Sequence, residues 1–204
     1  MNRLTRDDIQ LLFDEALIRA KNNALTHLLQ DMQHVRDQWI LHCRQNLLNI
    51  PEPLTSWNAK IHRGENHHGL PWMAWDYPAL MTTEDIFTFR TIFLWGQGIT
   101  CTLQLQGHRL EQLRPVLESS QAAFGENWQM AMGRDPWEHR FVAPHYEPVA
   151  SLSSEAWKKK IQLDAFVKIG RKLDGMELSG MEYFVKETGE TILSLVFPAH
   201  HPLH

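Results

Sequence analysis

The feature that most constrains how this chain folds is an aromatic-rich stretch at residues 57–107. Bulky rings recur there at spacings typical of strands, on both sides of a polar segment at 64–69. Aromatic side chains build cores and also line ligand sites, so the residues between them decide which role is favoured. Here the alternation favours a core, and the stretch is predicted to form the centre of a sheet.

Length and composition predict one folded unit. The chain has 204 residues, of which 43% are hydrophobic and 22% charged, enough to bury one core without disulfides or metal. A single domain over 1–204 is expected, with a helical segment at 1–50 and a sheet with two helices at 57–197. No apolar run approaches the roughly 18 residues that a membrane span needs.

Charge and cysteine content indicate the compartment and restrict the partners. Twenty Lys and Arg stand against 24 Asp and Glu, so no general attraction to nucleic acid or to a membrane surface is predicted. The first residues lead directly into an acidic amphipathic segment without an apolar signal region, which favours a cytoplasmic location. Cys43 and Cys101 are expected to be buried and reduced. A small molecule or another protein remains as partner.

Residues 5–50 have helical spacing. One apolar stripe includes Ile9 and Leu17, and a second runs from Leu25 to Trp39. Because the pair Asn22-Asn23 lies between them, one long bent helix and a pair of helices are both open. Prolines at 51 and 53 end the helical segment. These amphipathic helices offer a surface through which a homo-oligomer can form.

Two hairpins are predicted next. Strands at 57–63 and 70–77 pair around a loop at 64–69, with Arg63 opposite Leu70, which places Trp75 and Tyr77 on the face of Lys60 and His62. Strands at 86–95 and 99–106 pair around a three-residue loop at 96–98, with Phe93 opposite Cys101. Arg90 then lies with threonines and glutamines on the face opposite the rings.

The remaining segments alternate helices and hairpins. A helix is expected at about 108–124, or from about 113 with Pro115 in its first turn. A hairpin at 128–132 and 137–142, a helix with a stripe through 157–173, and a hairpin at 181–186 and 191–197 follow. The predicted fold class is α+β: a mostly antiparallel sheet built from hairpins, packed against the long N-terminal helical segment and two further helices.

Motifs do not define a reaction or a cofactor. Gly96 and Gly98 begin like a dinucleotide fingerprint, but a strand follows instead of a helix, so a hairpin turn is the better interpretation. Nucleophile elbows, zinc-protease motifs and paired-cysteine motifs do not occur in the sequence. No catalytic residue and no cofactor is therefore predicted.

The leading functional hypothesis is a ligand-binding or interaction module. It uses a polar and aromatic side of the sheet, and an arginine among aromatic rings can bind an anion or pair internally with Asp76. The predicted binding residues, together with neighbouring Asn58, are Lys60, His62, Arg63, Trp75, Tyr77 and Arg90.

The alternative is a metal-assisted, hydrolase-like enzyme. Its predicted metal ligands are His62, His67, His68 and Asp76, because imidazole and carboxylate suit zinc or iron. Glu138 and His139 are the candidate acid and base. Adjacent histidines point apart in a strand and converge only if the loop folds back, so a solvated turn is the simpler interpretation of 64–69.

Overall fold

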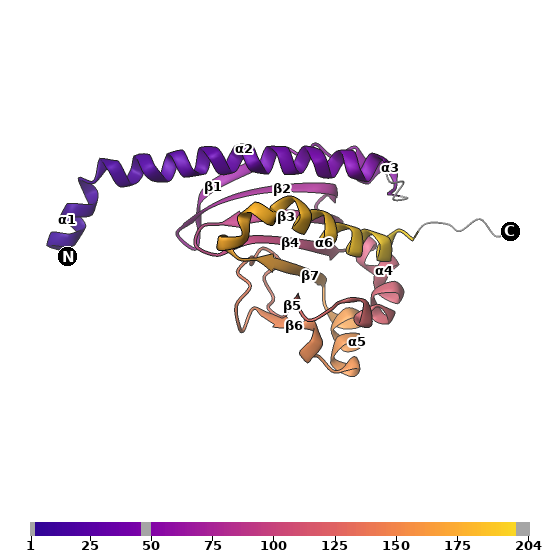
Figure 1. Ribbon diagram of the computed structural model, residues 1–204. Helices are drawn as coiled ribbons and strands as arrows, with labels where there is room; N and C mark the ends of the chain where they lie inside the picture. The colour runs from indigo at the N-terminus through magenta and orange to yellow at the C-terminus, as the bar shows by residue number, and fades with distance from the viewer. Residues whose placement is uncertain (1–2, 46–49, 199–204) are drawn as a thin grey trace.

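A computed structural model describes residues 3–45 and 50–198 and confirms the α+β fold class. Within these residues the strands form one seven-stranded antiparallel sheet in the order β1-β2-β3-β4-β7-β5-β6 (Figure 1). The strands are β1 (His62–His67), β2 (Leu70–Met81), β3 (Ile86–Leu94), β4 (Gly98–Gln106), β5 (Trp128–Ala131), β6 (Tyr146–Pro148) and β7 (Phe166–Leu173). That this is a single domain stays a prediction.

The helices lie before, between and after the strands. They are α1 (Arg6–Leu12), α2 (Glu15–Gln45), α3 (Glu52–Thr55), α4 (His108–Ser119), α5 (Ser154–Leu163) and α6 (Met181–Val196). Short 3-10 turns occur at η1 (Gln121–Ala123), η2 (Val149–Ser151) and η3 (Gly175–Gly180). In the described part of the chain, no helix combines the length and apolar character that a bilayer crossing requires.

The N-terminal segment is a helical pair with its break at Phe13 and Asp14. Thr5 caps α1 through a reciprocal pair of hydrogen bonds with Asp8. The second helix, α2, continues through Asn22 and Asn23, so of the two open arrangements the structure has the pair of helices, separated at residues 13–14 instead of at the asparagines. Asparagine is only a moderately poor helix former, and two exposed asparagines do not interrupt a helix of 31 residues. The helix α1 and the first turns of α2 extend beyond the sheet (Figure 1).

One face of the sheet packs against α2 and α6, and this helix-covered face holds the main core. Trp39 of α2 contacts Phe89, with ring centroids 5.3 Å apart, and its Nε1 donates to the Tyr77 carbonyl at 2.8 Å. The helix α6 approaches Trp39 at Gly189, where an added Cβ would lie 2.3 Å from the ring. A glycine at this position therefore permits the close packing of the two helices.

The first hairpin differs from the prediction in both turn and register. Residues 64–67 belong to β1, and Arg63 pairs with Met73 instead of Leu70. A two-residue turn, His68-Gly69, joins the strands, with φ angles of 53° and 82°. Positive φ at both central residues matches the twist of flanking strands, which favours this tight turn over a six-residue loop.

The second hairpin has the predicted faces but a register shifted by two residues. Phe93 pairs with Ile99, and Phe89 with Leu103. An even shift keeps every side chain on its face. The prediction used Gly98 in the loop, whereas Gly98 lies in β4, where an added Cβ would be 2.3 Å from the Leu173 carbonyl oxygen.

Three predictions for the second half of the chain are wrong. Residues 137–142 form no strand, and β5 pairs with β6 and β7 instead. The helical stripe ends with α5 at Leu163, because the β-branched run that follows forms β7. Residues 181–196 form one helix instead of a hairpin, since its buried residues recur at helical spacing.

The segment after β4 follows the earlier-starting prediction. The helix α4 begins at His108 with Pro115 inside it, and it ends at Ser119 instead of 124. Its residues Leu110 and Leu117 join the main core.

Candidate functional site

The second face of the sheet is polar and is covered by an irregular segment, residues 132–145. Alternate positions of β3, β4 and β7 bring Thr88, Gln104 and Lys168 into one cross-strand row. All three are at most 1% exposed. The covering segment is attached through Lys168, whose Nζ donates to the carbonyls of Pro136 at 3.1 Å and Glu138 at 2.8 Å. We call this the loop-covered face.

A cavity of about 450 Å³ opens between the loop-covered face and residues 132–145. That volume lies in the range typical of small-molecule sites. Its lining combines aromatic rings, imidazoles and one ion pair. The lining residues are His62, Asn66, His67, Trp72, Ala74, Asp76, Arg90, Ile92, Trp137 and His139.

The ion pair in this cavity joins two adjacent strands. Arg90 Nε donates to Asp76 Oδ1 at 2.8 Å, and Nη2 donates to Oδ2 at 3.0 Å. Thr88 donates to Asp76 Oδ1 at 2.6 Å. The guanidinium also lies over the ring of Trp137, 5.1 Å from its centroid. Arg90 is therefore fixed by a bidentate pair and a cation–π contact.

Lys168 and His139 form a buried hydrogen-bonded chain that ends at Arg90. Lys168 Nζ lies 2.8 Å from His139 Nδ1, and His139 Nε2 lies 3.5 Å from Arg90 Nη1. Burial, together with the Arg90 charge, holds the pKa of Lys168 well below its ordinary value. Burial, followed by the charges of Lys168 and Arg90, lowers the pKa of His139 in the same direction.

The lowered pKa values of Lys168 and His139 favour the neutral form of each group. A neutral Lys168 donates to the two carbonyls and accepts the Nδ1 proton of His139. His139 Nε2 then presents its lone pair to Arg90 Nη1. A charged Lys168 would instead donate to His139 Nδ1, so the proton of the neutral imidazole would lie on Nε2. That N–H would then face the Arg90 Nη1 donor at 3.5 Å. The floor of the cavity is therefore neutral apart from the Asp76–Arg90 pair.

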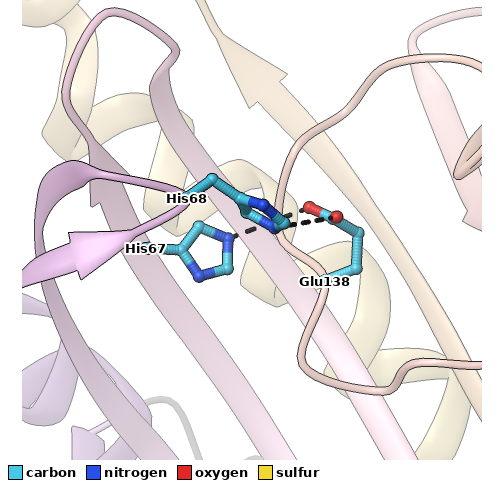
Figure 2. Close-up of side chains that lie close together, drawn as sticks. All are labelled: His67, His68 and Glu138. Carbon is cyan, nitrogen blue, oxygen red and sulfur yellow. Dashed lines mark ion pairs between the residues drawn. The ribbon is translucent and has the colours of Figure 1, made fainter. Parts of the chain in front are cut away.

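At the edge of the cavity, His67, His68 and Glu138 converge (Figure 2). The Nε2 atom of His68 lies 3.2 Å from Glu138 Oε2, and that of His67 lies 3.8 Å from Oε1. The positive φ of His68 turns the backbone back, so adjacent imidazoles face the same carboxylate. This is the folding back that the sequence required for convergence.

Glu138 is anionic and held in place by Arg140. Burial acts to raise its pKa, but hydrogen bonds from the Arg140 side chain and backbone outweigh burial and lower the pKa to about 2. The backbone N–H of Arg140 donates to Oε1 at 2.7 Å, and Nη2 donates to Oε2 at 2.7 Å. The pKa of His67 is lowered by burial and by the neighbouring His68. The cluster thus joins a fixed carboxylate to a neutral imidazole.

The predicted binding residues lie in three places. Trp75 and Tyr77 are fully buried on the helix-covered face. Asp76 pairs with Arg90, and Trp75 pairs with Thr91, so Arg90 shares its face with Asp76 and not with Trp75. Arg63 and Lys60 are exposed outside the cavity. His62 and Arg90 line it. The predicted shared surface of Arg90 with Trp75 and Tyr77 is therefore wrong.

The predicted metal ligands also separate. His67 and His68 converge, but their third partner is Glu138, while His62 and Asp76 line the cavity apart from this cluster. Asn58 is exposed.

Sequence reasoning missed Trp72, Trp137 and Lys168. The alternation of Trp72, Ala74 and Asp76 in β2 was a usable signal, since these residues share one face. Comparison of the chain with known protein families, curated proteins and solved structures finds no match.

Proposed function

We propose that this protein binds a small, uncharged aromatic molecule with a hydrogen-bond acceptor on its edge, in the cavity over Arg90. The observation that carries the proposal is the cavity itself, whose apolar walls surround a fixed guanidinium. Ligand sites combine apolar lining with a few placed polar groups in this way. The cytoplasmic location inferred from the sequence belongs to the same proposal.

The shape of the ligand follows from the rings in the lining. Trp72 is half-buried and Trp137 is 45% exposed, so both leave ring surface free for contact. Flat rings stack on such surfaces in offset or edge-to-face geometry. An aromatic ring therefore suits the walls better than a branched aliphatic chain.

The polarity of the ligand follows from charge and from Arg90. Asp76 and Arg90 neutralise each other, so the lining favours a ligand without net charge. Two nitrogens of Arg90 donate to Asp76, while Nη1 has only the 3.5 Å contact to His139. A carbonyl oxygen is the natural additional partner for Nη1.

A ligand-observed NMR titration tests the proposal with benzamide, benzoate and toluene as probes. Benzamide is expected to bind best, because it joins a ring to a neutral acceptor. Ala74→Leu, which fills the cavity from β2, and Trp137→Ala should weaken benzamide binding by about tenfold or more, equivalent to about 1.4 kcal/mol. Tyr183→Ala, on exposed α6 surface, is the matched control. Equal binding by all four proteins, or no binding of any probe, would overturn the proposal.

A further inference from the structure

We propose that His67, His68 and Glu138 form a binding site for a divalent transition-metal ion, Zn²⁺ in the first place. One possible ligand atom from each of the three residues, a ring nitrogen or a carboxylate oxygen, lies within 4.8 Å of the other two. Zinc bound by nitrogen and oxygen at about 2.0–2.2 Å in a tetrahedron holds neighbouring ligand atoms about 3.3–3.5 Å apart. The Nε2 atom of His68 lies 3.2 Å from Glu138 Oε2 and that of His67 lies 3.8 Å from Oε1, so side-chain rotations that draw the three groups together would complete the geometry.

The donor atom of His67 is available. Its Nε2 is buried and has no hydrogen-bond partner among the described residues. Buried polar atoms are almost always paired in native proteins, so an exception needs a physical reason. At 3.8 Å from Glu138 Oε1 the contact is too long for a hydrogen bond. A metal ion between the two atoms supplies the missing partner.

The cluster is held in position from both sides. On the hairpin, Asn66 Oδ1 accepts from the Gly69 backbone N–H at 2.9 Å and closes the turn that carries both imidazoles. Across from it, Arg140 holds Glu138 through backbone and side-chain donors. Hydrogen bonds that orient ligating carboxylates are a regular feature of metal sites. The same arginine neutralises Glu138, which predicts moderate affinity.

Three protein ligands leave one position open. Structural zinc sites use four protein ligands, whereas two histidines and a glutamate with one open position are typical of sites that bind water or substrate. His67 belongs to the cluster and also lines the cavity. The ion would therefore lie beside the cavity, and its binding does not depend on the small-molecule proposal above.

Isothermal titration with ZnCl2 tests the site, using tag-free full-length protein pretreated with chelator. Because His200, His201 and His204 can bind metal themselves, all proteins carry alanine at these three positions. The parent protein is expected to bind one Zn²⁺ per chain. His67→Ala and Glu138→Gln should each weaken binding by at least about tenfold, the lower end of the loss seen even for residues that only support ligands. Co²⁺ absorption of four-coordinate intensity should appear in the parent and be lost in His67→Ala and Glu138→Gln.

Two further variants separate loss of ligand from loss of fold. His68→Asn keeps a residue that tolerates positive φ, so the turn survives while the imidazole is lost. It should bind Zn²⁺ at least about tenfold more weakly, as expected for a lost ligand, with an unchanged circular dichroism spectrum. His27→Ala, exposed on α2, is the control and should bind normally. Absent stoichiometric binding, or binding that His68→Asn and Glu138→Gln leave unchanged, would overturn the proposal.

Discussion

The two faces of this sheet are built from alternate residues of the same strands, yet they follow different rules. On the helix-covered face, Phe89, Leu103 and Ile169 form a continuous apolar row. On the loop-covered face, the next row is Thr88, Gln104 and Lys168, equally buried but polar. The comparison indicates that the first face forms the main apolar core, while the second holds the buried polar groups beside which both proposed sites lie.

Buried polar atoms without a hydrogen-bond partner among the described residues occur on both faces, and on the helix-covered face they include Trp75 Nε1 and the Tyr77 hydroxyl. Gln104 is fully buried, and neither its Oε1 nor its Nε2 has a partner within the described residues. The buried hydroxyls of Thr100 and Thr102 also have no hydrogen-bond partner within the described residues. A buried polar group left unpaired costs about 1–3 kcal/mol. Each unpaired group therefore carries a stability cost, which the burial of apolar side chains in the main core offsets.

The largest expected effect on stability comes from a substitution on the helix-covered face. Phe89→Ala should lower the free energy of unfolding by about 3–5 kcal/mol, because it empties a site that is fully buried against Trp39. Urea denaturation measures the loss, and Tyr183→Ala serves as the exposed aromatic control. A loss below about 1 kcal/mol would break the comparison, since the supposed stabilising face would then contribute little.

Next in size is the attachment of the covering segment. Lys168→Met should cost about 1–3 kcal/mol, because it leaves the Pro136 carbonyl without its Lys168 donor and leaves the Glu138 carbonyl with the Tyr146 hydroxyl alone of its two described donors. Backbone amides at 136–139 should exchange hydrogen faster. Lys172→Met, on the same strand and face but paired with Asp174 at the surface, is the matched control. Unchanged exchange in Lys168→Met would show that Lys168 does not anchor the segment.

A pH dependence should originate on the apolar face. Burial raises the pKa of Cys101 from 9.0 to about 12, despite a hydrogen bond with Thr91. The folded state keeps the thiol proton while the unfolded state releases it above pH 9. The stabilising contribution is therefore complete below pH 9 and is lost as the pH rises toward 12, by up to about 1.4 kcal/mol per pH unit.

Urea denaturation between pH 8 and about 10.5 checks the sign. Stability of the wild type should fall over this range, and Cys101→Ala should fall less steeply because one buried thiol is gone. Parallel slopes for the two proteins would contradict the assignment to Cys101.

The smallest effect is expected at an unpaired hydroxyl of the polar face. Thr102→Val keeps the shape and removes a buried group without a described partner. It should change stability by less than about 1 kcal/mol, or raise it. Thermal unfolding compared with Thr88→Val, which breaks a 2.6 Å hydrogen bond to Asp76, sharpens the contrast. A loss at Thr102 equal to that at Thr88 would mean that the hydroxyl is satisfied in solution.

The strand faces of β3 and β4 were predictable because side-chain direction alternates with period two, and the aromatic residues mark one parity. The register of the β3–β4 pair was harder to predict from the sequence. It depends on which glycine lies in the turn and which one permits the close approach of another strand. Gly98 does the latter, next to Leu173. That neighbour is distant in sequence, so local pattern could not reveal it.

Prediction of the site had a similar limit. His67, His68 and Glu138 were all singled out by residue type within the same hypothesis, but in different roles: the histidines as metal ligands and Glu138 as an acid or base. Their meeting depends on the path of residues 132–145, which have no regular periodicity and were predicted to include a strand. Lys168 was hidden in a lysine-rich region, where charge alone suggested a solvated helix.

The path of residues 132–145 has a mechanical consequence. The segment leaves β5, the sixth strand in the sheet order, and reaches the turn between the first two strands. Contacts to Lys168 and Arg90 fasten it on the way. It therefore connects strands from opposite ends of the sheet order, and the position of Glu138 beside the two imidazoles depends on contacts made along its whole path.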